Sequence, residues 1–124
     1  MNRLTCKPQF VDKILDGSKT ATCRARRLFY DGEKFAFVTR QGKRPAFLVK
    51  ASDGFAFGRI IRSFDYYHHE FLPKGGHIGK HAKELGFDSV AEAREFYSKS
   101  LNPNRGCYVY RWELITKEEA MEAE

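Results

Sequence analysis

A lysine, two threonines and two arginines lie close together in residues 19–26, KTATCRAR. The hydroxyl of threonine is a weak nucleophile until an adjacent base removes its proton, and a neutral lysine amine can be that base. Thr22 and Lys19 could therefore act as nucleophile and base, which requires burial to lower the pKa of Lys19. The alternative is that Lys19 caps the preceding helix or binds phosphate, because the partial negative charge at a helix C-terminus favours the ammonium form.

Polar residues alternate with small ones through this run, which predicts a strand over residues 20–28. Thr20, Thr22, Arg24 and Arg26 would share one polar face, with alanine and cysteine on the other. Guanidinium groups can contact phosphate or a base edge through two hydrogen bonds at once. The alternative for the arginines is cross-strand ion pairing with Asp or Glu.

Other elements are needed to position this strand. A helix over residues 10–16 should end at Gly17, which can adopt the left-handed conformation. The aromatic-rich strand 55–67 should contain a bulge or bend near Gly58. Ser89 should cap the helix that follows it. We expect further strands over 3–6, 34–40, 45–51 and 107–115, and helices over 77–85 and 90–101. Residues 1–116 should form one domain, followed by a short acidic helical tail, 117–124.

Composition is typical of a folded domain, with 42% hydrophobic and 15% aromatic residues among 124. No apolar run approaches the ~20 residues that cross a bilayer, and residues 1–10 do not resemble a signal peptide. We therefore expect a cytoplasmic protein that does not bind membranes. Three widely spaced cysteines should be reduced and mostly buried.

Positive charge is concentrated in the first part of the chain. Residues 1–50 carry 12 Lys and Arg against 4 Asp and Glu, whereas residues 51–124 carry 10 against 12. A basic half of this kind favours a phosphate-bearing partner, although lysine-rich surfaces also serve solubility.

A second cluster, DYYHHEF at residues 65–71, mixes aromatic and protonatable side chains. Single-stranded bases stack on such rings, and the alternative is that Tyr and Phe complete the core. His77 and His81 have metal-ligand spacing, but zinc needs three or four ligands. We expect neither a metal ion nor a cofactor.

Two segments resemble the ASCH domain of the PUA-like superfamily. Residues 14–24, ILDGSKTATCR, are similar to the family pattern I-L-x-G-x-K-T-x-T-x-R, and HAKELGF at residues 81–87 supports it. The resemblance implies an α+β fold: a small PUA-like mixed or antiparallel β-barrel with flanking helices. One branch of the family removes the acetyl group of N4-acetylcytidine with a Lys, a Thr and a Glu. Lys19 and Thr22 match directly, Glu84 is the best candidate for the third residue, and Glu70 is the second choice.

The sequence therefore predicts recognition of RNA or a modified nucleobase, with or without amidohydrolase activity. The alternatives are a non-catalytic nucleic-acid-binding module and an ASCH-type ribonuclease. The chain is longer and more basic than the amidohydrolase branch, which favours a polymer or a phosphorylated ligand. Expected partners are RNA, single-stranded nucleic acid or a nucleoside, and the oligomeric state is left open. The candidate residues are, for catalysis, Lys19, Thr22 and Glu84, and, for ligand binding, Thr20, Arg24, Arg26, Tyr66, Tyr67, His69 and Lys80.

Overall fold

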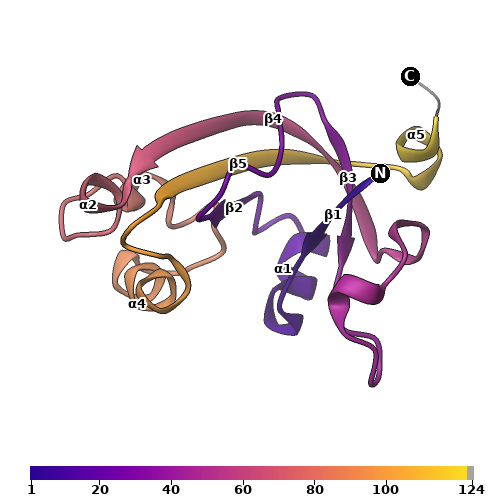
Figure 1. The fold of residues 1–124 in the computed structure, drawn as a ribbon, viewed down its shortest axis with the longest axis horizontal. Coiled ribbons are helices and arrows are strands. Elements are labelled where there is room, and N and C mark those ends of the chain that lie inside the picture. Colours follow the sequence, from indigo (N-terminus) through magenta and orange to yellow (C-terminus); the bar gives the residue numbers. More distant parts are fainter. Residues whose placement is uncertain (123–124) are drawn as a thin grey trace.

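The computed structural model describes residues 1–122, which form one five-stranded sheet with short helices around it (Figure 1). The strands follow the order β1-β3-β4-β5-β2 across the sheet. Strands β1 and β3 pair in parallel, and the other three pairs are antiparallel. The strands are β1 (Asn2–Thr5), β2 (Ala21–Arg24), β3 (Lys34–Val38), β4 (Ala56–Tyr67) and β5 (Gly106–Ile115).

Short helices gather around the long β4–β5 pair. In Figure 1, α1 and α4 lie below this pair, α2 and α3 lie at one of its ends, and α5 lies at the other. The helices are α1 (Val11–Leu15), α2 (His68–Phe71), α3 (Ile78–His81), α4 (Val90–Ser100) and α5 (Lys117–Met121). Single 3-10 turns occupy Pro8–Phe10, Ala46–Leu48 and Ala51–Asp53.

The core has two main parts, which meet at the β5 strand. One part packs α1 against the sheet through Phe10, Ile14, Phe37 and Trp112. The other packs α3 and α4 against β2 and β5, around residues such as Tyr97. All three cysteines are buried and free, as the sequence predicts.

Several predicted elements are confirmed. Strand β5 spans the whole predicted 107–115 segment and begins one residue earlier, at Gly106. Ser89 caps α4, because its Oγ accepts a hydrogen bond of 3.2 Å from the backbone N–H of Glu92. Gly17 follows α1 with a φ of +84°. Helix α5 forms over residues 117–121, and residues 123 and 124 of the predicted acidic tail lie outside the described residues.

The strand predicted over residues 45–51 is wrong, because two 3-10 turns stand in its place. An isolated bridge between Gln41 and Arg44 precedes these turns. Pro45 has no N–H to donate to a ladder, and Phe47 and Leu48 are exposed rather than packed on a sheet face. The apolar side chains of this segment therefore do not mark a strand.

The helix predicted over residues 77–85 is also wrong beyond its first turn. Helix α3 ends at His81, and residues 82–86 form turns in which the N–H of Phe87 donates to the carbonyl of Ala82 and the N–H of Gly86 to that of Lys83. The carbonyl of Glu84 accepts from the backbone N–H groups of Thr20 and Ala21, at 2.8 and 3.0 Å. These two bonds attach the segment after α3 to the start of β2.

The β-bulge lies a little later than predicted. The register between β4 and β5 shifts between Ile60 and Arg62, whereas Gly58 sits in a regular pair with Leu114. Gly58 is needed for packing instead, since a Cβ there would lie 2.7 Å from Cζ of Phe35. Within residues 1–122, no helix has the length and apolar character needed to span a membrane.

Candidate functional site

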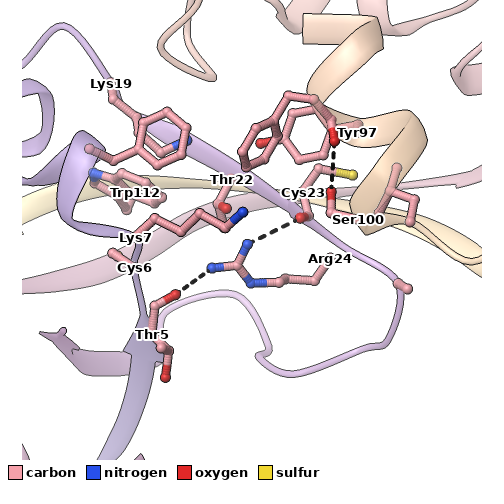
Figure 2. Close-up of a pocket in the computed structure, with 14 residues that line it drawn as sticks. Thr5, Cys6, Lys7, Lys19, Thr22, Cys23, Arg24, Tyr97, Ser100 and Trp112 are labelled. Atoms are coloured by element: carbon pink, nitrogen blue, oxygen red, sulfur yellow. Dashed lines mark hydrogen bonds between the residues drawn. The ribbon is translucent and has the colours of Figure 1, made fainter. Parts of the chain in front are cut away.

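Strands β1 and β2 are the two edges of the sheet, yet the side chain of Arg24 connects them. Its Nη2 donates a hydrogen bond of 2.7 Å to the carbonyl oxygen of Thr5, at the end of β1. Its Nη1 donates to the carbonyl of Cys23 at 3.3 Å. The sheet therefore curls until its edges meet at a seam that side chains close, and a cavity of about 250 Å³ lies at this seam (Figure 2).

The cavity wall combines cationic, aromatic and hydroxyl-bearing side chains from β1, β2, β5, α4 and the segment before α1. Its fourteen lining residues include no carboxylate. They are the cations Lys7, Lys19 and Arg24, the aromatic residues Phe10, Phe96, Tyr97 and Trp112, the hydroxyl-bearing Thr5, Thr22 and Ser100, and the small or apolar Cys6, Cys23, Ala25 and Leu101.

Lys19 is 3% exposed, and its Nζ donates a hydrogen bond of 2.6 Å to the carbonyl of Leu85. The Nζ also lies 4.6 Å from the ring centre of Phe10 and 5.9 Å from that of Trp112. Burial, reinforced by the charge of Arg24, lowers the pKa of Lys19 to about 7. Lys19 is therefore buried, as it must be to act as a neutral base. Its side chain bonds to Leu85 and does not cap α1.

Thr22 is 2% exposed and lies in the middle of β2, opposite Tyr110 of β5. The phenol of Tyr97 lies next to it. Burial raises the pKa of Tyr97 well above its ordinary value, although Thr22 and the backbone of Cys23 act in the opposite direction. Tyr97 is therefore a neutral phenol beside the Thr22 hydroxyl.

The carboxylate of Glu84 does not line the cavity. It accepts two hydrogen bonds from Arg111, from Nε at 2.8 Å and from Nη2 at 3.1 Å, and a third from Nδ1 of His81. Burial opposes the negative charge, but the hydrogen bonds from Arg111 and His81 outweigh it and lower the pKa of Glu84. The structure thus brings Lys19 and Thr22 together and leaves the carboxylate of Glu84 in a separate network. Glu70 is also elsewhere, since its Oε1 accepts from the backbone N–H of Tyr67 at 2.8 Å.

The predicted open polar face over residues 20–28 is wrong. Strand β2 ends at Arg24, and both of its faces are covered, so Thr22 is buried. Thr22 and Arg24 line the cavity, but Thr20 and Arg26 do not. The Thr20 carbonyl accepts a hydrogen bond from the N–H of Trp112 at 3.0 Å, and Arg26 is exposed beyond the strand.

The remaining predicted residues lie outside the cavity. Tyr66, Tyr67 and His69 line a second, more open hollow of about 510 Å³. The hydroxyl of Tyr66 forms a hydrogen bond of 2.8 Å with Nε2 of His81, and its ring stacks on that of His77 with centres 4.6 Å apart. Lys80 is exposed on α3 and lines neither space.

Sequence reasoning missed the aromatic wall of the cavity and Lys7 at its edge. Nζ of Lys7 lies 4.8 Å from the ring centre of Phe96, so a side chain from the start of the chain reaches α4. No local pattern joins these residues, because they come from segments far apart in the sequence. Arg111 was also missed, although an arginine flanked by Tyr110 and Trp112 in the strand CYVYRWELI was a usable signal.

Comparison with known proteins relates the whole arrangement to solved structures. No protein-family model and no curated protein matches the chain. The hypothetical protein PH0355 has a TM-score of 0.61 and 14% identity, covering 91% of this chain and 97% of its own. A mutant of the ZmASCH protein from Zymomonas mobilis has a TM-score of 0.54 and 10% identity, covering 94% and 74%. The chain has an ASCH-like fold.

A third similar structure, EF3133 from Enterococcus faecalis, is described as a member of family DUF984. It has a TM-score of 0.51 and 15% identity, covering 86% of this chain and 70% of that one. The predicted α+β class, with a small PUA-like barrel and flanking helices, is confirmed by the ASCH-like fold. The barrel is a curled mixed sheet, and Arg24 closes its seam with side-chain hydrogen bonds instead of a strand ladder.

Proposed function

We propose that this ASCH-like protein recognises a nucleobase of RNA in the cavity at the β1–β2 seam. The observation that carries the proposal is the pairing of two buried polar side chains, Lys19 and Thr22, with four aromatic rings around one cavity. Rings provide stacking surfaces for a planar base, and the polar groups can hydrogen-bond to its edge. The cavity of about 250 Å³ is slightly smaller than typical drug-sized sites of about 300–1,000 Å³, which favours one base over a larger ligand.

Charge supports a ligand that carries phosphate. Lys7 and Arg24 both line the cavity, and Figure 2 shows Arg24 bonded to the carbonyl oxygens of Thr5 and Cys23. Since the lining contains no carboxylate, the cations of the wall are not neutralised within it. A nucleotide whose base enters the cavity would therefore meet positive charge.

A second candidate is hydrolysis of an amide on the bound base, and the pKa of Lys19 near 7 favours it. In this reaction Oγ1 of Thr22 attacks the carbonyl carbon of an N4-acetyl group while Nζ of Lys19 takes the hydroxyl proton. The C–N bond then breaks, and Lys19 returns the proton to the leaving amine. Water finally hydrolyses the acetyl ester on Thr22 to release acetate. Arg111 and His81 hold the carboxylate of Glu84, the third catalytic residue that the family resemblance implies, so in this proposal Lys19 acts as both base and acid.

The experiment that tests both candidates uses the wild type, Lys19→Ala, Thr22→Ala and the exposed-lysine control Lys74→Ala. Acetate release from N4-acetylcytidine is measured beside binding to short single-stranded RNA at two salt concentrations. The length of the RNA after incubation is checked on a gel, because cleavage would indicate the ribonuclease alternative.

Turnover that both cavity variants lose and Lys74→Ala keeps would establish hydrolysis. Salt-sensitive binding without turnover, weakened in the cavity variants, would establish a binding module. RNA recognition in this cavity is wrong if the wild type binds neither probe, or if the cavity variants bind both probes as the wild type does.

A further inference from the structure

The second hollow, which we call the Tyr67 hollow, lies where β4 ends and α2 begins. Tyr67 is 70% exposed, and its ring stacks on that of His69, with centres 5.5 Å apart and planes at 11°. Tyr30 and Phe47 are similarly exposed, at 67% and 68%. In the described part of the chain neither of those rings stacks on another ring. Tyr67 differs from them because it forms a stacked pair with His69 beside the hollow.

Local hydrogen bonding fixes the position of this aromatic pair. The backbone N–H of Tyr67 donates to Oε1 of Glu70 at 2.8 Å, and Tyr67 is the N-cap residue of α2. The backbone of Tyr67 is therefore fixed, and the ring of His69 packs against its side chain. These contacts reduce the entropic cost of stacking a base on the ring.

The Tyr67 hollow and the cavity are neighbours in the fold. Arg24, which lines the cavity, pairs directly across β2 and β5 with Tyr108, which lines the hollow. Leu101 at the end of α4 lines the cavity, and residues 103–106 that follow it line the hollow. Directly paired residues of an antiparallel ladder share one face, so a ligand lying over Arg24 and Tyr108 reaches both spaces.

Charges around the hollow are compatible with a phosphate backbone. Its two carboxylates are engaged, since Asp65 pairs with Arg27 and Glu70 holds the N–H of Tyr67. The guanidinium of Arg27, which pairs with Asp65, lies 5.6 Å from the ring centre of Tyr108. Arg105 adds a further cation to the lining.

We propose that the Tyr67 hollow binds a second, unpaired base of a single-stranded RNA whose neighbouring base occupies the cavity. This inference rests on the proposed function and deepens it, because it makes the ligand a strand rather than a free nucleoside. Tyr67 stacks on the base, Arg24 lies along the path of the intervening phosphate, and Arg105 is the cation at the hollow.

The test compares two probes, N4-acetylcytidine and a four-nucleotide single-stranded RNA that contains one N4-acetylcytidine. Dissociation constants, or KM where turnover occurs, are measured for the wild type, Tyr67→Ala, Tyr67→Phe and the matched control Tyr30→Ala. Tyr67→Ala should weaken binding of the tetranucleotide about ten-fold and leave the nucleoside unchanged. Tyr67→Phe keeps the ring and should bind the tetranucleotide nearly as well as the wild type, as should Tyr30→Ala.

Two results would overturn the second-base site while leaving the cavity proposal standing. One is a wild type that binds the nucleoside as tightly as the tetranucleotide. The other is a Tyr67→Ala variant that binds the tetranucleotide as the wild type does, or loses no more affinity than Tyr30→Ala. If neither probe binds the wild type, the cavity proposal and the second-base site are both wrong.

Discussion

Arg24 in β2 donates a hydrogen bond of 2.7 Å to the carbonyl oxygen of Thr5 in β1, and so joins the two edge strands of the sheet. A strand ladder would fill this seam with backbone. The arginine contact leaves room beside it, and the cavity that holds Lys19 and Thr22 occupies that room. The incomplete closure of the barrel therefore creates the candidate site.

Replacing Arg24 tests the seam directly. Arg24→Ala should lower the free energy of unfolding by about 1 kcal/mol, the usual net contribution of one hydrogen bond, because the bond to Thr5 is exposed to solvent. It should also weaken RNA binding. The slope of the logarithm of the binding constant against the logarithm of the salt concentration should become shallower by about one. Urea unfolding and binding titrations at several salt concentrations measure the two effects. Arg26→Ala, exposed and outside the cavity, is the control, and equal losses in both variants would contradict the seam's role.

Burial of Lys19 should be visible in the pH dependence of stability. Its pKa is about 7 in the folded protein and near 10.5 when exposed, so between these values only the unfolded chain binds the proton. Stability should therefore rise with pH in this window, by up to about 1.4 kcal/mol per pH unit from this group. In Lys19→Met this contribution should be absent. Urea unfolding at pH 7, 8 and 9 compares the two proteins, and parallel pH profiles would contradict the lowered pKa.

If the protein hydrolyses N4-acetylcytidine, the same pKa should govern the rate. A base must be neutral to take the proton of Thr22, so kcat/KM should fall about ten-fold for each pH unit below about 7 and level off above it. Acetate release between pH 5.5 and 9 measures the profile. A rate that does not change across pH 7 would exclude Lys19 as the base.

Glu84→Gln should affect stability far more than ligand binding, since the carboxylate contacts Arg111 and His81 and not the cavity. We expect a loss of about 1–2 kcal/mol at pH 7, less than for a fully buried pair because the Arg111 side chain is 39% exposed. The pKa of Glu84 is lowered by folding, so its contribution is present above pH 4.5 and disappears as the pH falls through the folded value.

Unfolding of Glu84→Gln by urea at pH 7 and pH 3 checks this prediction. The matched control is Glu113→Gln, which removes an exposed ion pair with Arg59 and should change stability by less than about 0.5 kcal/mol. If Glu84→Gln keeps its stability but no longer binds or turns over ligand, Glu84 acts in ligand binding or catalysis and this prediction is wrong.

Gly58→Ala tests the packing of the sheet. The added Cβ would lie 2.7 Å from Cζ of Phe35, whose side chain is fully buried, so overpacking should cost about 1–3 kcal/mol. Gly79→Ala is the control, because its Cβ would meet nothing within 4 Å and alanine favours the helix there. Thermal or urea unfolding should show a loss for Gly58→Ala alone.

Local sequence patterns predicted the parts of the fold that local physics controls. Alternating apolar residues marked β5, Ser89 marked the start of α4, and Gly17 marked the end of α1. Each of these signals acts within a few residues, through side-chain alternation, a cap or a backbone preference. Patterns failed where long-range contacts decided the conformation. The carbonyl groups of residues 84–86, for example, accept hydrogen bonds from Thr20, Lys19 and Lys13 and not from a following helical turn.

The candidate site divides in the same way. The sequence by itself determined that Lys19, Thr22 and Arg24 lie near one another, because they fall within six consecutive residues, Lys19 just before the short strand β2 and the other two within it. Only the tertiary structure decided that Lys19 and Thr22 are buried, that aromatic rings from distant segments surround them, and that the carboxylate of Glu84 turns to Arg111. The physical reason is that burial and charge pairing depend on which elements the curled sheet brings together, and the spacing of residues along one strand does not contain that information.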